Sequence, residues 1–532
     1  MNPTSPPVDP AWCTLGDVLR EHALARSSDT AAVCGDRRWS WFELDGRVDR
    51  LAAVLAGSGV SPGDRVLWLG QNCHRLLELI LAAGQLGAAC CPVNWRQSPD
   101  ELAFVIDDLE PRFVVWQDAE IGEHVAKARA AAKAAAAAVW IRHDSAGPGS
   151  YESLLDPPLT TPPPLAAPAA GHSPGEPRTA AQSVDPEAPV LILYTAAFDG
   201  RPNGALLPHR ALLAQGFIGV MLGLAGPDDV YLNSGPLFHV GTLKATLATF
   251  VAGGTNVFTP RVDPEELCRL VSAHRCTGAF LQPPTVEAIV EANRDGRYDL
   301  STLRAKPGPP GWNAMVTVDR GPRLKSGYGQ TEVAGVVTYV DPIRPCLGQA
   351  GRPGPLARVE VVDSDGRPLP AGQVGELVVR GPMVMAGYHR RPELTAHRHR
   401  GGWHHTGDLG RREADGSLSF VGPMTRLIKS AAENVYPAEV EACLRAHPAV
   451  AEAAVIGVPD AAWGQAVKAI VVLQSGEQVD EAALIAHCRA LIASYKKPRS
   501  VGFADALPRK GGAVDYDALD ACYGGGGYPG QP

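Results

Sequence analysis

The chain has 532 residues, which is longer than a typical single domain of ~100–200 residues and therefore predicts more than one domain. Hydrophobic residues make up 45% of the chain and charged residues 20%, which supports large buried cores and excludes an intrinsically disordered protein. The formal net charge is −8, and Lys and Arg residues are scattered rather than clustered, so no nucleic-acid partner is expected.

The first part of the chain predicts helices and strands in alternation. Residues 12–60 predict a helix, a hairpin and a longer amphipathic helix. A short buried strand, RVLWLGQN, is followed by the helix HRLLELILAAGQLG and the strand CCPVN. The alternation resumes with PVLILY at 189–194 and continues to about residue 310. This pattern favours a layered α/β domain with a largely parallel sheet.

Two segments in this part have a different composition. Residues 126–140 are predicted to form an alanine-rich helix. Residues 145–189 are dense in Pro, Ala, Gly and Ser and have little periodicity. They predict a surface loop or a partly disordered insertion.

The second part of the chain predicts two smaller units. Residues from about 345 to 422 alternate period-two segments with Gly and Pro turns, which indicates a β-rich subdomain. After Arg426, a helix, two strands and a helix predict a small α+β domain. We therefore expect a large N-terminal domain (1–425), a small C-terminal lid domain (426–520) and a disordered tail (521–532).

The chain is expected to be a soluble cytoplasmic protein. It has eleven cysteines, an odd number, and Cys90-Cys91 lie in an apolar run, which favours buried free thiols over disulfides. The N-terminal MNPTSPPVDPAW lacks a basic segment followed by an apolar stretch, and no apolar run reaches the ~20 residues that span a bilayer. A monomer and a homodimer are both compatible with the sequence.

Six separated segments follow one another in a recognisable order. They are VNWRQSPDELAFVIDD (93–108), PLFHVGTL (236–243), GYGQTE (327–332), ELVVRGPMVMAGYHRRPELT (376–395), WHHTGDLGRREADGSLSFVG (403–422) and IKSAAENVYPAEVE (428–441). With these segments, almost the whole chain resembles the adenylate-forming (ANL) superfamily of AMP-dependent ligases and acyl-CoA synthetases. The resemblance implies a hinge near Arg426 and a mobile C-terminal domain. It also implies formation of an acyl-adenylate from a carboxylic acid and ATP, followed by acyl transfer to a thiol, usually that of CoA.

The resemblance also implies a nucleotide site. Joining a carboxylate to the α-phosphate of ATP brings negative charges together, so such a site must supply hydrogen-bond donors, cations and Mg²⁺. By the match, Tyr328 stacks on adenine, Thr331 bonds the α-phosphate, Glu332 holds Mg²⁺ and Asp408 accepts both ribose hydroxyls. The alternative is that Tyr328 and Asp408 serve only turns and packing. The expected nucleotide-binding residues are Thr195, Tyr328, Gly329, Gln330, Thr331 and Asp408.

The expected catalytic residues are His239, Thr331, Glu332 and Lys429. His239 lies in PLFH near the expected acyl pocket, and a buried core histidine is the alternative. Lys429 lies beside the hinge, where it could also be a solvated surface charge. The histidine-rich run HRHRGGWHH (397–405) alternates with arginines and is interpreted as a solvated loop rather than a metal site.

The chain departs from the family in its phosphate loop. The family pattern is close to T-S-G-T-T-G-x-P-K-G, whereas residues 195–204 read TAAFDGRPNG. Asp199 replaces a hydroxyl residue and Asn203 replaces the lysine. A like-charge pair at ~4 Å and an effective dielectric constant of ~20 costs roughly 4 kcal/mol, so Asp199 would oppose the β- and γ-phosphates. A tolerated loop variant, with Arg201 offsetting part of the charge, is the alternative.

The C-terminal catalytic lysine of the family is also missing. The segment LPRKGGAVDYDAL places Val514 or Ala513 at its position, and Lys510 lies three or four residues too early unless the loop is reshaped. Around the hinge, the family's Gly-Arg is Gly422-Pro423, and the Gly-Gly of the pantetheine tunnel is Ala431-Ala432. The Gly-Gly-Ala loop of the acyl pocket reads PGPPGWN, at 307–313.

These departures leave three functions open. The first is an acyl-CoA-synthetase-like enzyme that acts on a carboxylic acid or its activated form and a thiol such as CoA, with impaired or lost ATP-dependent adenylation. The second is a repurposed enzyme that transfers or hydrolyses a preformed acyl-adenylate or acyl thioester. The third is a non-catalytic scaffold. The expected cofactors are AMP or ATP with Mg²⁺, and CoA.

Overall fold

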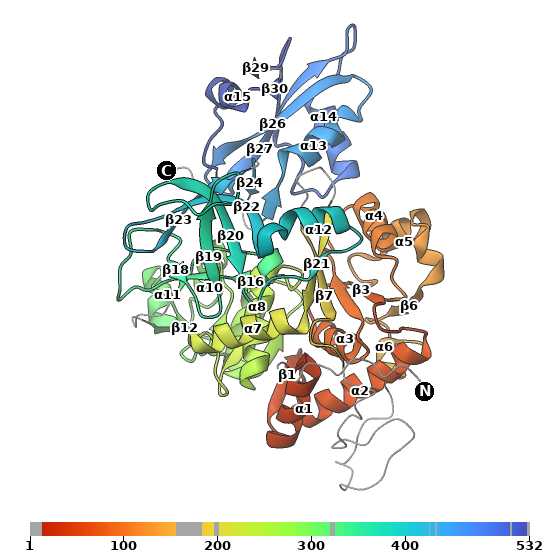
Figure 1. The fold of residues 1–532 in the computed structure, drawn as a ribbon. Coiled ribbons are helices and arrows are strands. Elements are labelled where there is room, and N and C mark those ends of the chain that lie inside the picture. Colours follow the sequence, from red (N-terminus) through yellow and green to blue (C-terminus); the bar gives the residue numbers. More distant parts are fainter. Residues whose placement is uncertain are drawn as a thin grey trace, which may run out of the picture.

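The computed structural model describes residues 13–155, 184–195, 202–319, 325–424, 426–430, 433–510 and 513–528. Figure 1 shows a large N-terminal body with the C-terminal part of the chain placed on top of it as a lid. The phosphate-loop residues 196–201 and the pair at 431–432 lie outside the described residues. The chain passes from the body into the lid around Arg426, where the hinge is expected.

The body is organised around a sheet of seven strands in the order β21-β8-β7-β4-β3-β5-β6. The strands from β7 to β6 run parallel, while β8 and β21 add an antiparallel edge. This arrangement confirms the predicted α/β class. The strands are β3 (Arg65–Leu69), β4 (Ala89–Pro92), β5 (Phe113–Trp116), β6 (Val139–Arg142), β7 (Pro189–Thr195), β8 (Asn203–Pro208) and β21 (Gly387–Tyr388).

Helices cover both faces of this sheet. Because side chains alternate along a strand, Cys90 packs into one core and its neighbour Cys91 into the other. Both thiols are buried, and none of the eleven cysteines forms a disulfide, as predicted. One face is covered by α2 (Trp41–Gly57), α3 (His74–Gln85) and α7 (His209–Met221), and the other by α4 (Pro99–Leu109) and α5 (Gly122–Ala131).

A second sheet of five strands, in the order β11-β9-β10-β1-β2, lies beside the first. Its strands are β1 (Thr30–Cys34), β2 (Arg37–Ser40), β9 (Val230–Asn233), β10 (Thr255–Phe258) and β11 (Gly278–Ala279). Helices α8 (Val240–Ala252) and α9 (Pro264–His274) pack on its strands, and α10 (Pro283–Ala292) packs on α9; α1 (Leu15–Ala25) packs on α2 and α3. Together α1, β1, β2 and α2 form the helix, hairpin and helix predicted for 12–60.

The β-rich subdomain is an antiparallel sheet in the order β19-β20-β22-β23, as predicted for the segment up to residue 422. Its strands are β19 (Arg358–Val362), β20 (Val374–Arg380), β22 (His404–Arg412) and β23 (Leu418–Pro423), and α12 (Pro392–Arg398) precedes β22. Two short ladders pack against its core: β15 (Gly329–Gln330) with β16 (Gly335–Val336), and β14 (Lys325–Ser326) with β17 (Thr338–Val340) and β18 (Arg352–Pro353). A third, β12 (Arg304–Ala305) with β13 (Thr317–Val318), packs beside the five-stranded sheet.

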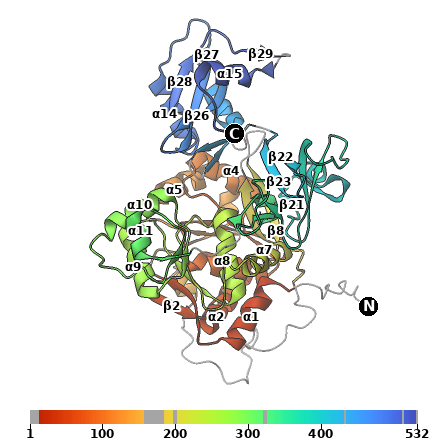
Figure 2. The ribbon, with the colours of Figure 1, turned by 90° about the vertical axis from the view of Figure 1, so that its left-hand side faces the viewer.

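The lid contains the predicted helix, strands and helix together with two hairpins. Its sheet has the order β25-β24-β27-β26, and a parallel strand β28 pairs with β27. The strands are β24 (Ile428–Ser430), β25 (Glu433–Val435), β26 (Val450–Asp460), β27 (Gly464–Leu473) and β28 (Ser500–Phe503). The helices are α13 (Pro437–Arg445), α14 (Glu481–Leu491) and α15 (Tyr516–Tyr523), and β29 (Arg509–Lys510) pairs with β30 (Ala513–Val514). Figure 2 shows the lid resting on one end of the body.

Three local predictions differ from the structure. The alanine-rich helix ends at Ala131 rather than near 140, because the chain turns to add β6 to the sheet; Asp107 Oδ1 accepts a bond from Ala134 N at 2.8 Å in that turn. Within the predicted loop 145–189, α6 (Tyr151–Leu154) buries Tyr151 completely, and residues 156–183 lie outside the described residues.

The tail is the third difference. It was expected to be disordered over 521–532, yet α15 continues to Tyr523 and the Tyr528 side chain is only 7% exposed. Residues 529–532 lie outside the described residues. Across the described chain, the helices are too short or too polar to cross a membrane.

Candidate active site

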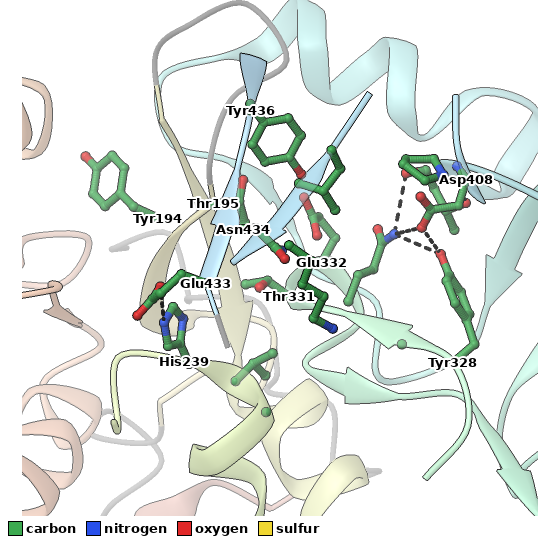
Figure 3. Close-up of a pocket in the computed structure, with 18 of the residues that line it drawn as sticks. Tyr194, Thr195, His239, Tyr328, Thr331, Glu332, Asp408, Glu433, Asn434 and Tyr436 are labelled. Carbon is green, nitrogen blue, oxygen red and sulfur yellow. Dashed lines mark hydrogen bonds and ion pairs between the residues drawn. The ribbon is translucent and has the colours of Figure 1, made fainter. Parts of the chain in front are cut away.

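A cavity of about 1300 Å³ lies between the body and the lid. Figure 3 shows side chains from both parts directed into it. All the residues expected from the sequence to bind nucleotide or act in catalysis line this one cavity. They are Thr195, His239, Tyr328, Gly329, Gln330, Thr331, Glu332, Asp408 and Lys429.

The segment GYGQTE forms one wall because a glycine lets two backbones approach. A Cβ on Gly329 would lie 2.0 Å from the carbonyl oxygen of Gly335, so a larger residue would break the β15–β16 ladder. The turn that closes this ladder begins at Thr331 and includes Glu332. The ladder therefore fixes the two residues expected to meet the phosphate and the metal ion.

Tyr328, Gln330 and Asp408 form a hydrogen-bonded group on this wall. The Tyr328 hydroxyl donates to Asp408 Oδ2 at 2.5 Å, and Gln330 Nε2 lies 3.0 Å from the Tyr328 hydroxyl. Burial raises the pKa of Asp408 to about 6. Because Oδ2 is already bonded, Oδ1 is the carboxylate oxygen with no hydrogen bond among the described residues. It is the oxygen best placed to accept from a ligand hydroxyl.

Gln330 is in turn held by a histidine from the run 397–405. His404 Nε2 lies 2.8 Å from Gln330 Oε1, and His405 Nδ1 lies 2.7 Å from Glu376 Oε2. Among the described residues, no group of three or more His, Cys, Asp or Glu side chains could hold a metal ion. The two histidines at the start of β22 are thus buried supports of the cavity wall, and the interpretation as a solvated loop is wrong for them.

Glu332 is the carboxylate expected to hold Mg²⁺. It is 9% exposed, and the Tyr388 hydroxyl donates to its Oε1 at 2.8 Å. Its backbone carbonyl accepts from Met385 N at 2.8 Å, which holds the turn in place. Mg²⁺ is commonly bound through one or two carboxylates together with phosphate oxygens and water. One fixed carboxylate therefore fits a Mg²⁺ ion that arrives with a nucleotide.

His239 is paired with the lid rather than buried in a core. Its Nε2 lies 3.1 Å from Glu433 Oε2, a residue of β25, as the dashed line in Figure 3 marks. The Arg96 guanidinium forms an ion pair with the other oxygen of Glu433. Burial alone would raise the pKa of Glu433, but His239 and Arg96 outweigh it and lower that pKa. The imidazole is thus held at the cavity by a charged carboxylate.

The hairpin β24–β25 brings the lid into the cavity. Lys429, Glu433, Asn434 and Tyr436 all line it. Of the described lining residues, three are Lys or Arg, and two of these are neutralised: Arg411 lies 2.7 Å from Glu413, and Lys496 is paired as described next. Lys429 has an exposed side chain with no carboxylate within ion-pair distance among the described residues. It is the cation available to a ligand.

Lys496 fastens the lid to the body. Its Nζ lies 2.6 Å from Glu101 Oε1 of α4 and 2.5 Å from Glu439 Oε1 of the lid. Glu101 is positioned by a capping box, in which Ser98 accepts from Glu101 N and Glu101 accepts from Ser98 N. Burial disfavours the ammonium, but Tyr495, Glu439 and Glu101 outweigh it and raise the pKa of Lys496. The Lys496 ammonium therefore remains charged at neutral pH.

Of the altered positions that the structure describes, Asn203, Lys510 and Val514 do not line the cavity, whereas Pro423 does. Lys510 is exposed on β29, Val514 lies on β30, and neither lines the cavity. Figure 1 shows this hairpin at the outer end of the lid. Asn203, which the sequence comparison with the family's loop pattern aligned with a lysine, is 8% exposed and pairs with Thr195 in the β7–β8 hairpin. In this lid orientation, Lys510 therefore does not reach the cavity.

The assignment of 307–313 to the acyl pocket does not hold. These residues lead into α11 (Pro310–Met315), where Trp312 is 2% exposed and its Nε1 donates to the carbonyl of Lys306 at 3.2 Å. None of them lines the cavity. The apolar residues that line the cavity on the β9–α8 side of the body include Phe238, Val240 and Phe280.

Several cavity residues were missed in the sequence. Glu433, Asn434 and Tyr436 stand within IKSAAENVYP beside Lys429, and that motif could have identified them. Tyr495 and Lys496 had no such signal, because SYKKPRS is typical of an exposed basic segment. Their positions depend on the docking of the lid on the body, which brings together residues about 400 positions apart in the sequence.

Two family models match the chain. Residues 19–389 match the AMP-binding enzyme model, and residues 439–512 match the AMP-binding enzyme C-terminal domain. The first covers more than half of the chain, and the passage from the body to the lid lies in the unmatched stretch 390–438 between them.

Curated proteins and solved structures agree with this match. The chain is 36% identical to a feruloyl-CoA synthase of Amycolatopsis sp over 491 residues, covering 91% of this chain and 93% of the relative. It is 34% identical to the indoleacetate–CoA ligase of Aromatoleum aromaticum over 510 residues, covering 93% and 95%. An amide bond synthetase from Marinactinospora thermotolerans superimposes with a TM-score of 0.78 at 27% identity, covering 96% of this chain and 100% of that structure.

Proposed function

Because the chain belongs to the AMP-binding enzyme family, we propose that it transfers an acyl group from an acyl-adenylate to a thiol, in the manner of an acyl-CoA ligase. We further propose that its ATP-dependent adenylation is weak. The observation that carries the proposal is the lid orientation. It presents Lys429 and Glu433 to the cavity and leaves Lys510 and Val514 outside it.

The nucleotide part of the ligand is assigned to the wall around GYGQTE. Asp408 Oδ1 accepts a ribose hydroxyl, and Thr331 donates to the α-phosphate. Glu332 receives the Mg²⁺ that accompanies a phosphorylated ligand. Tyr328 lies beside Phe420 with ring centroids 5.7 Å apart and an interplanar angle of 25°, so the two rings form an aromatic surface for a purine.

The acyl part is assigned to the β9–α8 side of the cavity. Phe238, Val240 and Phe280 lie there, and His239 stands between this side and the lid hairpin. Apolar and aromatic linings favour a hydrophobic acyl group. Since the relatives named above include a feruloyl-CoA synthase and an indoleacetate–CoA ligase, we propose an aromatic carboxylic acid as the source of the acyl group.

The transfer step needs a thiolate and a stabilised leaving group. The thiol sulfur attacks the acyl carbonyl carbon, a C–S bond forms, the C–O bond to the phosphate breaks, and AMP leaves. His239 takes the thiol proton, and Glu433 holds the imidazole in place. Lys429 offsets the negative charge that develops on the carbonyl oxygen and remains on the AMP phosphate.

The proposal of weak adenylation rests on the few unpaired cations among the described residues that line the cavity. Pyrophosphate release needs cations at the β- and γ-phosphates, yet Asn203 is buried in a strand and Lys510 is remote. The sequence adds Asp199 to the phosphate loop. Arg411 and Lys496, the other two cations among the described lining residues, are already paired with carboxylates.

The test compares the two half-reactions on the full-length protein. Feruloyl-AMP and CoA are supplied, and feruloyl-CoA and AMP are measured by chromatography; in parallel, ferulate, ATP and Mg²⁺ are supplied, and pyrophosphate release is measured. We expect transfer to be clearly faster than adenylation. Asp408→Ala serves as the control, since it removes the proposed ribose contact and should weaken both reactions.

Other outcomes contradict the proposal in distinct ways. Fast pyrophosphate release would show that adenylation is intact. Consumption of feruloyl-AMP at the same rate without CoA would indicate a hydrolase. Reaction with an amine in place of CoA would indicate amide bond formation, the activity in the name of the synthetase from Marinactinospora thermotolerans.

A further inference from the structure

The hinge residue Arg426 is held by the C-terminal end of the chain. Its Nη2 lies 2.6 Å from Asp520 Oδ2 and 3.1 Å from Asp517 Oδ1. Its Nη1 donates to the Tyr528 hydroxyl at 2.9 Å. The guanidinium also lies over the rings of Tyr516 and Tyr528, 5.0 and 4.8 Å from their centroids. Two carboxylates, a hydroxyl and two rings therefore fix this side chain to the lid.

Tyr528 is the centre of this arrangement. A tyrosine hydroxyl can donate one hydrogen bond and accept two. Here it donates to Asp520 Oδ1 at 2.9 Å and accepts from Arg426 and from Gly457 N, each at 2.9 Å. The side chain is 7% exposed. All three bonding positions are used, which is not expected of the end of an unstructured tail.

The same tail reaches the cavity through one glutamine. Gly526 N donates to the carbonyl of Gly457 at 2.9 Å, and Gln465 Nε2 donates to the carbonyl of Gly526 at 2.7 Å. The Gln465 Oε1 then accepts from Lys429 N at 2.8 Å. Gln465 is 2% exposed. The tail is therefore bonded, through one buried side chain, to the strand that carries Lys429 into the cavity.

We propose that residues 524–528 are a positioning element of the lid. Through Tyr528 they hold the hinge residue Arg426, and through Gln465 they set the strand of Lys429, so that the lid favours the orientation seen here. The proposal rests on the function proposed above for its effect on catalysis. Its effect on the lid orientation is independent of that function.

The first test measures lid orientation in the full-length protein. Spin labels are placed at Glu123→Cys on the body and Glu477→Cys on the lid, both exposed, after the exposed thiols Cys13 and Cys522 are changed to serine. Distances are compared between the labelled parent, Tyr528→Phe and Tyr523→Phe. Tyr523 is the matched control, because its hydroxyl makes no hydrogen bond in the described part of the chain.

In Tyr528→Phe we expect the population of other lid orientations, relative to this one, to rise about tenfold or more, as for the loss of a hydrogen bond to a charged group. Tyr523→Phe should match the parent. Asp520→Asn, a second variant that weakens the same group, should move the distances in the same direction if Tyr528→Phe fails to fold. Identical distance distributions in all variants would overturn the proposal.

The second test separates positioning from general stability. With feruloyl-AMP and CoA, Tyr528→Phe should lower kcat by up to about fivefold, since the parent lid already favours this orientation, and leave KM for feruloyl-AMP unchanged, because the nucleotide wall belongs to the body. A rise in KM with unchanged kcat would contradict the positioning role. If the parent protein shows no transfer at all, the proposed function fails, while the distance measurement still decides whether the tail fixes the lid.

Discussion

The two hairpins of the lid have opposite environments. The hairpin β24–β25 lies against the body, where Glu433 pairs with His239 and Arg96 and Lys429 lines the cavity. The hairpin β29–β30 lies at the outer end of the lid, where Lys510 is exposed (Figure 1). The first hairpin presents Lys429 and Glu433 to the cavity, whereas Lys510 and Val514 of the second do not line it. In this orientation the lid therefore brings its charge to the cavity through β24–β25.

The largest effect should come from the inner hairpin. Lys429→Ala removes the cation that faces the cavity without a carboxylate partner among the described residues. We expect transfer from feruloyl-AMP to CoA to slow by about a hundredfold or more, as for other groups that stabilise developing negative charge. Lys510→Ala on the outer hairpin is the matched control and should stay within about twofold, the range of an exposed surface charge. An equal loss of transfer rate in the two variants would contradict the different roles assigned to the two hairpins.

The next effect should come from the contact that holds the inner hairpin in place. Lys496→Met leaves Glu101 and Glu439 facing each other without their cation. We expect the free energy of lid docking to weaken by about 2 kcal/mol, which lowers the ratio of docked to undocked lid about thirtyfold. Truncating one partner of a buried charge pair costs at least this much. Distances between labelled sites on the body and lid measure it. Lys497→Met, at the half-buried neighbouring position where Nζ donates only to the carbonyl of Ser494 among the described residues, should leave the distances unchanged.

A smaller effect should follow from pH. Because the pKa of Asp408 is raised to about 6, its carboxylate is charged at pH 7 and largely protonated at pH 5. Adenosine affinity should therefore fall about tenfold between pH 7 and pH 5, as one carboxylate acceptor is lost. Adenosine avoids the titration of a phosphate, and calorimetry measures the affinity. If adenosine affinity fell equally between pH 7 and pH 5 in Asp408→Asn, the pH effect would belong to another titratable group.

For folding, the pH effect of Asp408 has the opposite sign. Its pKa is higher in the folded than in the unfolded chain, so the folded protein binds more protons between the two values. Its contribution to the free energy of unfolding therefore decreases as the pH rises through this range. Low pH stabilises this part of the fold while it weakens adenosine binding.

The smallest effect should come from adding a positive charge to the outer hairpin. Val514→Lys places a lysine where the family resemblance expects one. In the present orientation that position is outside the cavity, so pyrophosphate release should rise by no more than about threefold, equivalent to less than 1 kcal/mol. A rise of a hundredfold would show that the lid reorients freely and that one lysine restores adenylation.

The sequence predicted the fold and the body wall of the cavity because both depend on local patterns. The alternation of strands and helices predicted the parallel sheet. In GYGQTE, Gly329 allows the close pairing of β15 with β16, and the turn that follows begins at Thr331. Asp408 and His239 also lie at the cavity, as their motifs indicated.

The parts that escaped prediction depend on contacts between distant segments. Lys496 belongs to a basic segment, and only docking against Glu101 buries it. Tyr528 follows four glycines, a composition typical of a flexible tail, yet three hydrogen bonds hold its hydroxyl. The alanine-rich helix is shorter than its propensity predicts, because pairing of β6 with β5 overrides local preference.

Because the body and the lid both line the cavity, docking of the lid affects the yield of thioester per acyl-adenylate. An acyl-adenylate is a mixed anhydride that water hydrolyses, and Glu433, Asn434 and Tyr436 close the cavity only while the lid is docked. For the proposed activity, the Lys496 contact thus sets how many AMP molecules are released for each thioester formed. A lid that stays docked protects the acyl-adenylate from water, but it must open to release the product. A stronger Lys496 contact should therefore reduce hydrolysis and also slow product release.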